Sequence, residues 1–310
     1  MSLYNTYRPT SLEEIQGNTS AKRSLSSIIE RGEIPHAVLL QGPRGCGKTT
    51  LARIMAKELK CDTIDPAHSM DLQELDIGSF GGVAEVKSLK RKVYHKPMNG
   101  PVRVWILDEA HGLKSEQARN AMLKVLEEPP SYVYFFLCTT DPQKLTATIK
   151  SRCTPISVGP LNEKQTIRWL KKICQLEQTK VPNSVLREVY NASLGHPRDA
   201  LSILETILGL DPEDMEGAAL EEASKRNAGI ELARAIWKGE DWEVIASILK
   251  GIDEEPETVR RICMGYFNTI LLSGNEAAAV AMEPFYEKNT FDCGKPGLTM
   301  MAFAAYKDLQ

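Results

Sequence analysis

The chain has 310 residues, a formal net charge of −3, 42% hydrophobic residues and 25% charged residues. That length corresponds to roughly two domains of ordinary size, and the composition is normal for a globular protein with its own hydrophobic core. The small net charge excludes a global basic field of the kind that indicates nucleic acid, although a local basic patch is compatible with it.

The seven cysteines are odd in number, widely spaced and without a CxxC pair. This pattern predicts reduced thiols and argues against a disulfide framework or a zinc ribbon. The polar N-terminal stretch MSLYNTYRPTSLEE has no apolar signal region, and no apolar run approaches the roughly 18 residues of a membrane span. We therefore expect a cytoplasmic protein with no membrane partner.

The first 160 residues are expected to alternate helices and strands. A helix is predicted over residues 19–30, and further helices over 50–60 and 116–128. Short apolar runs typical of buried strands occur at 37–40, 72–77, 102–107 and 133–138, with a candidate fifth strand at 154–158. This alternation predicts an α/β fold with a mostly parallel sheet covered by helices on both faces.

After Gly159-Pro160 the pattern becomes helical only. Apolar stripes predict helices over 161–176 and 182–192, and Pro197 is suited to the first turn of a third helix. Residues 213–310 are expected to form another set of helices, for example over 258–272. We therefore expect three domains, with bounds at 1–160, 161–212 and 213–310.

The strongest motif is GPRGCGKTT, which matches GxxxxGK[ST] between the strand at 37–40 and a predicted helix. Small residues in such a loop let backbone N–H groups surround phosphates at a helix N-terminus. The lysine supplies a positive charge to the outer phosphates, and the threonine hydroxyl is suited to Mg²⁺. The candidate ATP-binding residues of this loop are Gly42, Arg44, Gly45, Cys46, Gly47, Lys48, Thr49 and Thr50.

A second motif, VRVWILDEAH, places Asp108 and Glu109 at the end of an apolar strand. Ligands bind at the carboxyl ends of the strands in open α/β sheets. Asp108 is therefore a candidate Mg²⁺ ligand, and Glu109 a candidate base for the attacking water. The alternative is a solvated acidic turn.

A third, weaker motif is FFLCTTDPQK. The strand is expected to end at Cys138, which would expose Thr139 and Thr140. A hydroxyl at this place is suited to contact the γ-phosphate or the attacking water. Threonines at strand ends are also common turn formers, so the motif has little weight alone.

Seven segments together resemble the clamp-loader ATPases of the AAA+ superfamily, and above all the bacterial polymerase III gamma/tau subunits and their phage-type relatives; replication factor C small subunits are more distant. The segments are YRP (7–9), GPRGCGKTT (42–50), ILDEAH (106–111), NAMLKVLEEPP (120–130), TTDPQKL (139–145), SRC (151–153) and GHPRDAL (195–201). The resemblance covers residue 4 to about residue 205, in the family's order.

The resemblance implies roles for particular residues. Arg8 and Pro9, with the stretch from Ile15 to Gly17, would border the adenine pocket. Thr140 would be the first sensor, and Arg198 the second sensor, which reaches the γ-phosphate from a helical lid. Arg152 would be the arginine finger that enters the ATP site of the neighbouring subunit. Its alternative role is a structural ion pair, which is the usual fate of an arginine.

The resemblance also implies contacts with DNA. Positions matching Lys87, Ser115 and Lys124 lie in the family on helices that line a central chamber and contact phosphates. The stretch KSLKRKVYHK (87–96) is locally basic. Most charge runs are solvated helix faces, however, and that alternative stays open for this stretch.

Two features depart from the gamma/tau pattern. The family's four zinc-binding cysteines lie between the phosphate loop and the acidic motif, where this chain has only Cys61, so no zinc is expected. The chain also ends at Gln310 without the long polymerase- and helicase-binding tail. We therefore expect a reduced, phage-like loader subunit.

The function implied by the resemblance is that of an ATPase subunit of a sliding-clamp loader that uses ATP and Mg²⁺. Its expected partners are a sliding clamp, primer-template DNA and other loader subunits in a pentameric ring. Residues 161–212 would form the lid and 213–310 the oligomerising collar. Two alternatives are a DNA ring motor of the branch-migration type and a non-hydrolysing scaffold subunit of the same ring.

Overall fold

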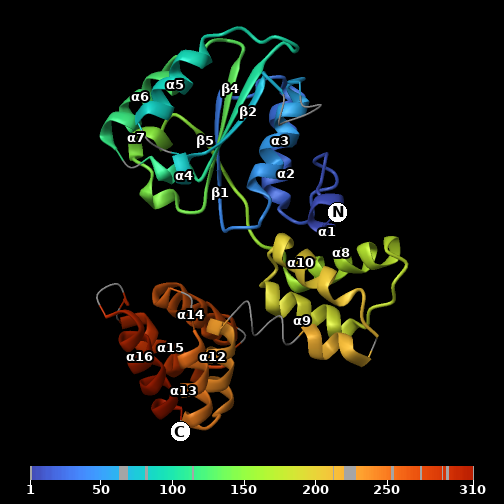
Figure 1. Cartoon of the computed structure of the whole chain (residues 1–310), viewed down its shortest axis with the longest axis vertical. Coiled ribbons are helices and arrows are strands. Elements are labelled where there is room, and N and C mark those ends of the chain that lie inside the picture. The colour runs from blue at the N-terminus through green and yellow to red at the C-terminus, as the bar shows by residue number, and fades with distance from the viewer. Residues whose placement is uncertain are drawn as a thin grey trace. The chain divides into compact units, whose positions relative to one another are not determined.

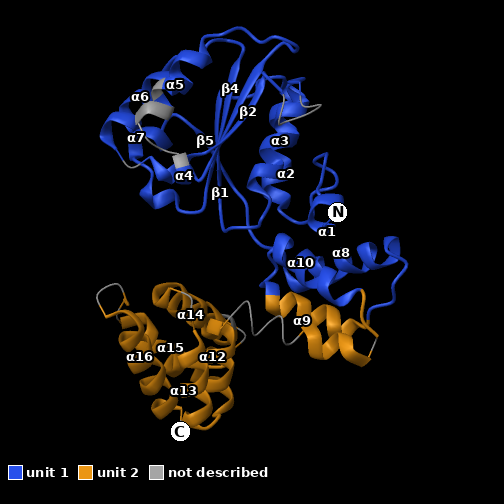
Figure 2. Cartoon of the chain, viewed as in Figure 1, with its two compact units in different colours: residues 1–181, 193–208 blue, residues 182–192, 209–310 orange. Residues whose placement is uncertain are grey.

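The computed structural model of the chain describes residues 2–62, 69–80, 83–113, 115–211, 213–219, 228–252, 255–272, 274–287, 289–290 and 293–309. Within its helices, the side chains of residues 80, 83–85, 87 and 269 also lie outside the described set. The chain divides into two compact units, and Figure 2 shows them in two colours. Unit 1 comprises residues 1–181 and 193–208, and unit 2 comprises residues 182–192 and 209–310.

Unit 1 is built around a parallel sheet of five strands in the order β2-β3-β4-β1-β5. The strands are β1 Ala37–Gln41, β2 Leu72–Asp76, β3 Arg103–Asp108, β4 Val133–Thr139 and β5 Thr154–Ser157. All five predicted strands are therefore present, and the α/β fold is confirmed. The strand at 72–77 was expected to be buried, but β2 is an edge strand in which only Leu72 is fully buried.

Helices cover both faces of this sheet, as Figure 1 shows. On one face α2 (Thr19–Arg31) and α3 (Lys48–Glu58) pack against alternate strand residues such as Val38, Ile106 and Phe136. On the other face α5 (Val83–Val93) and α6 (Glu116–Glu127) pack against the intervening residues, such as Leu39, Trp105 and Phe135. Since successive side chains of a strand point to opposite faces, each strand contributes to two separate cores.

Shorter elements connect the strands and helices of unit 1. They are α1 Leu3–Thr6, α4 Ile77–Phe80, α7 Ala147–Lys150, and the 3-10 turns η1 Ala110–Gly112 and η2 Pro142–Lys144. Two further helices complete the unit, α8 Glu163–Leu176 and α10 Pro197–Ile207. A reciprocal cap between Asn162 and Gln165 starts α8, and Pro197 occupies the first turn of α10, as predicted.

All the regular secondary structure described in unit 2 is helical. Its helices are α9 Asn183–Ser193, α12 Ala228–Lys238, α13 Trp242–Gly251, α14 Pro256–Leu272, α15 Ala277–Glu287 and α16 Gly294–Asp308, and residues 213–219 are also helical. The last five of the named helices share a core that includes Ile236, Phe267, Phe285 and Leu298. The boundaries at 160 and 212 stay predictions, because the two compact units follow a different division.

Among the described residues, no helix has both the length and the low polarity needed to cross a lipid bilayer.

Candidate functional site

The phosphate loop joins the end of β1 to the start of α3, which begins at Lys48. Three of its glycines have positive φ, with values of 151° at Gly42, 75° at Gly45 and 96° at Gly47. A β-carbon at Gly42 would lie 1.8 Å from the carbonyl oxygen of Val158, so the loop passes too close to the chain after β5 for any side chain. The loop therefore needs glycine both for its backbone shape and for its packing.

Lys48 lies at the N-terminus of α3 and is buried, with 6% of its surface exposed. Its Nζ donates hydrogen bonds of 2.8 Å to the carbonyl oxygens of Gly42 and Pro43, which belong to the same loop. The ammonium is thus held inside the loop by backbone acceptors. Together with the free N–H groups of a helix N-terminus, it forms a binding site suited to anions.

Thr49 and Asp108 bring two hard oxygen donors together. The Thr49 hydroxyl donates to Oδ2 of Asp108 at 2.8 Å, although the two residues come from different elements, α3 and the end of β3. Mg²⁺ prefers oxygen ligands, and a protein usually gives it one or two such ligands beside phosphate oxygens. The donor set at this point therefore fits the ion that the sequence predicted.

Glu109 follows Asp108 and has a left-handed backbone with φ 46°. Such a conformation is unfavourable for a residue with a side chain and is concentrated at functional sites. Glu109 Oε2 accepts a hydrogen bond of 2.9 Å from the Thr140 hydroxyl and lies 3.4 Å from Nδ1 of His111. The carboxylate is thus oriented by the predicted sensor threonine and by a histidine that sequence reasoning did not single out.

Thr139 corrects one sequence prediction. It was expected to lie exposed beyond the strand, but β4 extends through Thr139, which is completely buried. Its hydroxyl contacts His111 Nδ1 at 3.0 Å and accepts from the backbone N–H of Asp141 at 3.1 Å. The bond to the Glu109 carboxylate comes instead from Thr140, the first residue after β4.

Arg198 comes to the phosphate loop from α10, about 150 residues further along the chain. Its backbone N–H donates to the Gly45 carbonyl oxygen at 3.3 Å. A β-carbon at Gly45 would lie 3.3 Å from Cβ of Arg198, so helix and loop are in close contact. The guanidinium carbon lies 4.9 Å from the ring centre of Tyr4, a residue of α1.

These elements enclose a cavity of about 580 Å³ at the carboxyl ends of the strands. The predicted residues that line it are Arg8, Pro9, Ile15, Arg44, Gly45, Cys46, Gly47, Lys48, Thr49, Thr50, Asp108, Glu109 and Arg198. Gly42 and Thr140 do not line the cavity directly but bond to residues that do. This volume lies in the usual range of small-molecule sites and is large enough for a nucleotide.

Gln16, from the stretch 15–17 expected at the adenine pocket, also lines the cavity. Sequence reasoning missed several other lining residues: Tyr4, Tyr7, Asp76, Gly78, Ser79, Trp169, Pro197 and Leu201. Asp76 gave a usable signal, since it ends β2 as Asp108 ends β3. Its side chain caps the start of α4 through Ser79, and this hydrogen bond lowers the pKa of Asp76. Tyr4 and Trp169 gave no signal, because only the fold brings α1 and α8 to the cavity.

Cys46 lies inside the phosphate loop, but its thiol is not poised for reaction. Burial raises the pKa of Cys46 to about 11, despite the opposing effect of the nearby Lys48 ammonium. A thiol with such a pKa is almost entirely protonated at neutral pH and is a weak nucleophile. Cys46 therefore acts as a small buried side chain.

Arg152 does not line the cavity that contains its own Lys48, and it lies just after the short helix α7. Its Nη2 pairs with Glu127 Oε1 at the end of α6, and its Nη1 donates to the Thr148 carbonyl oxygen at 2.8 Å. The side chain of Arg152 is 31% exposed and that of Glu127 is 46% exposed. The ion pair that sequence reasoning held as the alternative is thus present within the single chain, and it lies at the surface.

The three expected DNA contacts all lie on α5 or α6. Ser115 is the N-cap of α6, and its hydroxyl oxygen accepts from the backbone N–H of Ala118 at 3.1 Å. Lys124 is exposed in the last turn of that helix. Lys87 belongs to α5, but its side chain lies outside the described residues.

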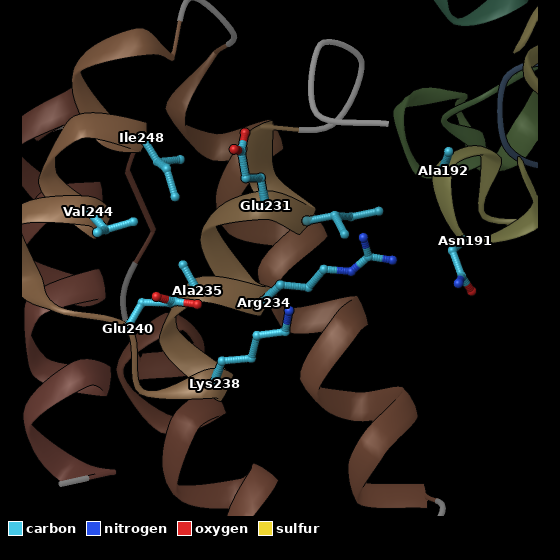
Figure 3. A pocket seen from close by; sticks show the side chains of 10 residues that line it. Asn191, Ala192, Glu231, Arg234, Ala235, Lys238, Glu240, Val244 and Ile248 are labelled. Carbon is cyan, nitrogen blue, oxygen red and sulfur yellow. The ribbon is translucent and has the colours of Figure 1, made fainter. Parts of the chain in front are cut away.

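A second cavity, of about 260 Å³, lies in unit 2 and was not predicted. Figure 3 shows Glu231, Arg234 and Lys238 projecting from α12 beside it. Arg234 Nη2 lies 4.0 Å from Glu188 Oε2, which is a residue of α9. In the described part of the chain, no group of three or more histidine, cysteine or carboxylate side chains could hold a metal ion.

Comparison with known proteins finds similarity to subunits of DNA polymerase III. The family model described as "DNA polymerase III, delta subunit" matches residues 17–162. The DNA polymerase III subunit gamma/tau of Mycobacterium bovis is 37% identical over 225 residues, covering 67% of this chain and 39% of that protein. The subunit tau of Escherichia coli is 31% identical over 314 residues, covering 90% and 48%. The chain spans less than half the length of these two relatives.

Among solved structures, the Thermotoga maritima RuvB Holliday junction branch migration motor has a TM-score of 0.57. The alignment covers 82% of this chain and 84% of that chain at 20% sequence identity. This likeness shows a shared fold. The phosphate loop and the sequence relatives confirm the resemblance found in the motifs: the chain is an AAA+ protein of the clamp-loader type, related to the gamma/tau subunits of DNA polymerase III.

Proposed function

We propose that this chain is an ATP-hydrolysing subunit of a sliding-clamp loader. The observation that carries the proposal is the pair of hydrogen bonds that joins three separate elements at one cavity. Thr49 of α3 bonds to Asp108 of β3, and Thr140 after β4 bonds to Glu109. Neither bond belongs to the backbone pairing of the sheet. A subunit that served only as a scaffold would therefore not need this arrangement.

Six residues in or beside the cavity have a defined task in this proposal. Lys48 and the N-terminus of α3 bind the outer phosphates. Thr49 and Asp108 would hold Mg²⁺, which supplies positive charge to the phosphate oxygens when it is bound. Glu109 accepts a proton from the attacking water. Thr140 orients the Glu109 carboxylate, and Arg198 brings a second positive charge from the side of α10.

Arg152 would act on a neighbouring copy and not on its own site. Its surface position and its separation from Lys48 support this role. An arginine finger neutralises charge that develops during phosphoryl transfer. The planar guanidinium that now pairs with a carboxylate has the donor geometry to bind a phosphate instead.

The binding energy of ATP would favour the assembled, clamp-bound arrangement of the ring. A ligand shifts such an equilibrium only by its differential affinity for the two states. Ser115 and Lys124 on α6, with Lys87 on α5, would contact phosphates of primer-template DNA. Phosphate contacts suit a loader that must accept any template, because they carry no sequence information.

The test separates nucleotide binding from hydrolysis with Glu109→Gln. The amide keeps the shape of the side chain but is not a base, so we expect ATP binding within about twofold of wild type and a loss of roughly 10²–10⁴ in hydrolysis rate. The assembled ring should then retain clamp and DNA. The matched control is Glu58→Gln, which changes an exposed carboxylate at the end of α3. Wild-type turnover by Glu109→Gln would remove Glu109 from the mechanism.

A DNA ring motor of the branch-migration type is the second candidate, favoured by the likeness of the fold to RuvB. The two candidates differ in what ATP accomplishes. A loader leaves a closed clamp on circular primed DNA, while a motor moves junctions processively without a clamp. ATP-driven branch migration by the purified chain, abolished by Lys48→Ala and kept by Lys57→Ala, would establish the motor in place of the loader.

A further inference from the structure

The side chain of Tyr4 lies against two arginines at the edge of the nucleotide cavity. The guanidinium carbon of Arg8 lies 4.7 Å from the centre of the Tyr4 ring, and that of Arg198 lies 4.9 Å from it. The Tyr4 hydroxyl also accepts a hydrogen bond from Nη2 of Arg8. All three residues line the same cavity.

The two arginines reach this ring from distant parts of the chain. Arg8 follows α1 directly, whereas Arg198 belongs to the first turn of α10, and α1 packs against α10. The buried Leu3 fixes α1 to the unit. The Tyr4 ring is therefore held in place by α1, and it lies beside α10, the helix that carries Arg198.

The surroundings of Arg198 give this contact its importance. Its backbone is fixed beside the phosphate loop through Gly45, but its side chain has several freely rotating bonds. In the described part of the chain, no carboxylate forms an ion pair with Arg198. The face of Tyr4 is thus the contact that restrains the guanidinium, and a cation over an aromatic face is favourable.

We propose that Tyr4 is a positioning residue that holds Arg198 beside the phosphate loop for the terminal phosphate of a nucleoside triphosphate. The ring limits the positions of the Arg198 guanidinium, so less conformational freedom is lost when the phosphate binds. Arg8 contacts the same ring and donates to its hydroxyl, so it holds the ring in position beside Arg198. This inference rests on the proposed function, because it concerns the same ATP site.

The test compares Tyr4→Leu, which removes the ring, with Tyr4→Phe, which keeps the ring and removes only the hydroxyl. The matched control is Tyr132→Phe, which removes a hydroxyl bond to the Tyr94 carbonyl oxygen and involves no residue that lines the cavity. Dissociation constants are measured for a slowly hydrolysed ATP analogue and for ADP. We expect Tyr4→Leu to weaken the analogue roughly threefold to thirtyfold and ADP less than about twofold, with Tyr4→Phe close to wild type.

A double-mutant cycle makes the test specific. In a chain that already carries Arg198→Ala, Tyr4→Leu should weaken the analogue no further, because the interacting partner is gone. Circular dichroism of each variant checks that the fold is intact.

Two results would overturn the inference. One is an equal loss of analogue and ADP affinity in both Arg198 backgrounds, which would make Tyr4 a wall of the cavity. The other is unchanged analogue affinity in a folded Tyr4→Leu protein. If the unmutated chain bound neither nucleotide, the proposed function itself would be wrong. Measuring the unmutated chain therefore separates that failure from a failure of the Tyr4 inference.

Discussion

Two arginine–glutamate pairs in this molecule have opposite surroundings. Arg152 and Glu127, at the corner between α6 and α7, have side chains that are 31% and 46% exposed. Arg260 and Glu257, in α14, have side chains that are only 12% and 5% exposed. The same two residue types therefore form one pair at the surface and one pair in the interior.

The inner pair belongs to a closed network. Glu257 accepts two hydrogen bonds from Arg260, at 2.9 and 2.7 Å, and two bonds of 3.0 Å from the backbone and hydroxyl of Thr290. Arg260 also donates to the carbonyl oxygen of Phe285. These bonds tie α14 to the end of α15 and to the chain after it, so the network holds unit 2 together.

The outer pair has no such network. Besides Glu127, Arg152 contacts only a backbone carbonyl within its own turn, among the bonds of the described residues. Exposed pairs contribute little to stability, while a buried pair that loses one partner leaves an uncompensated charge. The comparison teaches that an arginine in an ion pair is available for another partner only where the pair is exposed.

The largest effect is expected for Arg152→Ala in the assembled ring. Loss of a finger should lower DNA-stimulated hydrolysis by roughly 10³–10⁵, while the isolated chain stays folded and binds nucleotide. The measurement is the turnover rate with clamp and primed DNA present, and the matched control is Arg168→Ala, an exposed arginine of α8.

Mixing experiments decide whether this effect acts between subunits. Neither Arg152→Ala nor Lys48→Ala chains should hydrolyse ATP alone. Mixed rings contain interfaces in which an intact Lys48 faces an intact Arg152, so partial activity should return. If mixed rings form and stay inactive, Arg152 is a structural residue and the contrast with Arg260 disappears.

Glu257→Gln should give the next largest effect, on stability and not on turnover. The substitution leaves the buried Arg260 without its counter-charge, which should cost about 3 kcal/mol. Hydrogen exchange of the α14 amides measures the local loss. Glu276→Gln, at an exposed position of the same unit, is the control. If Glu257→Gln lowered ATP hydrolysis but left the hydrogen-exchange protection of α14 unchanged, the structural role of Glu257 would be wrong.

The same pair predicts a pH dependence. Hydrogen bonds from Arg260 above all, with those from Thr290 and Arg261, lower the pKa of Glu257 from its ordinary value to about 2. A lowered folded-state pKa gives stability that is complete above the unfolded value and is lost as pH falls through the folded value. Protection of α14 should therefore decline between about pH 4.5 and 2. The Glu257→Gln variant should lack this decline, and an equal decline in both proteins would assign it to other carboxylates.

A smaller effect is expected for Lys124→Ala, one turn before Glu127 in α6. Loss of one phosphate contact should reduce the slope of DNA affinity against salt by about one, equally for all template sequences. Affinity is measured at several salt concentrations, with Lys172→Ala on α8 as the control. An unchanged slope would make Lys124 part of a solvated helix face.

The smallest effect is expected for Glu127→Gln. Removing an exposed partner should change stability by less than about 1 kcal/mol and turnover of the ring by no more than about threefold, because Arg152 must leave Glu127 to act on a phosphate. Thermal unfolding and turnover are measured side by side with Arg152→Ala. A loss as large as that of Arg152→Ala would show that the pair, and not the free arginine, is the working unit.

The sequence by itself determined the local elements and the chemistry of the nucleotide site. Strands at 37–40, 102–107 and 133–138 are apolar runs with β-branched or aromatic residues, and their period and length are local properties. The loop from Gly42 to Thr49 was recognisable because glycine, lysine and threonine have fixed tasks at fixed spacing. Asp108 and Glu109 followed from their place at a strand end.

The tertiary structure decided which distant residues meet. Tyr4 and Trp169 reach the cavity only because α1 and α8 pack beside it, and no local pattern encodes that contact. Thr139 is buried because β4 ends one residue later than the sequence predicted. A sequence pattern locates the end of a strand only approximately. Whether an arginine pairs at the surface or in the interior depends on the surrounding solvent exposure, and so only the fold distinguished Arg152 from Arg260.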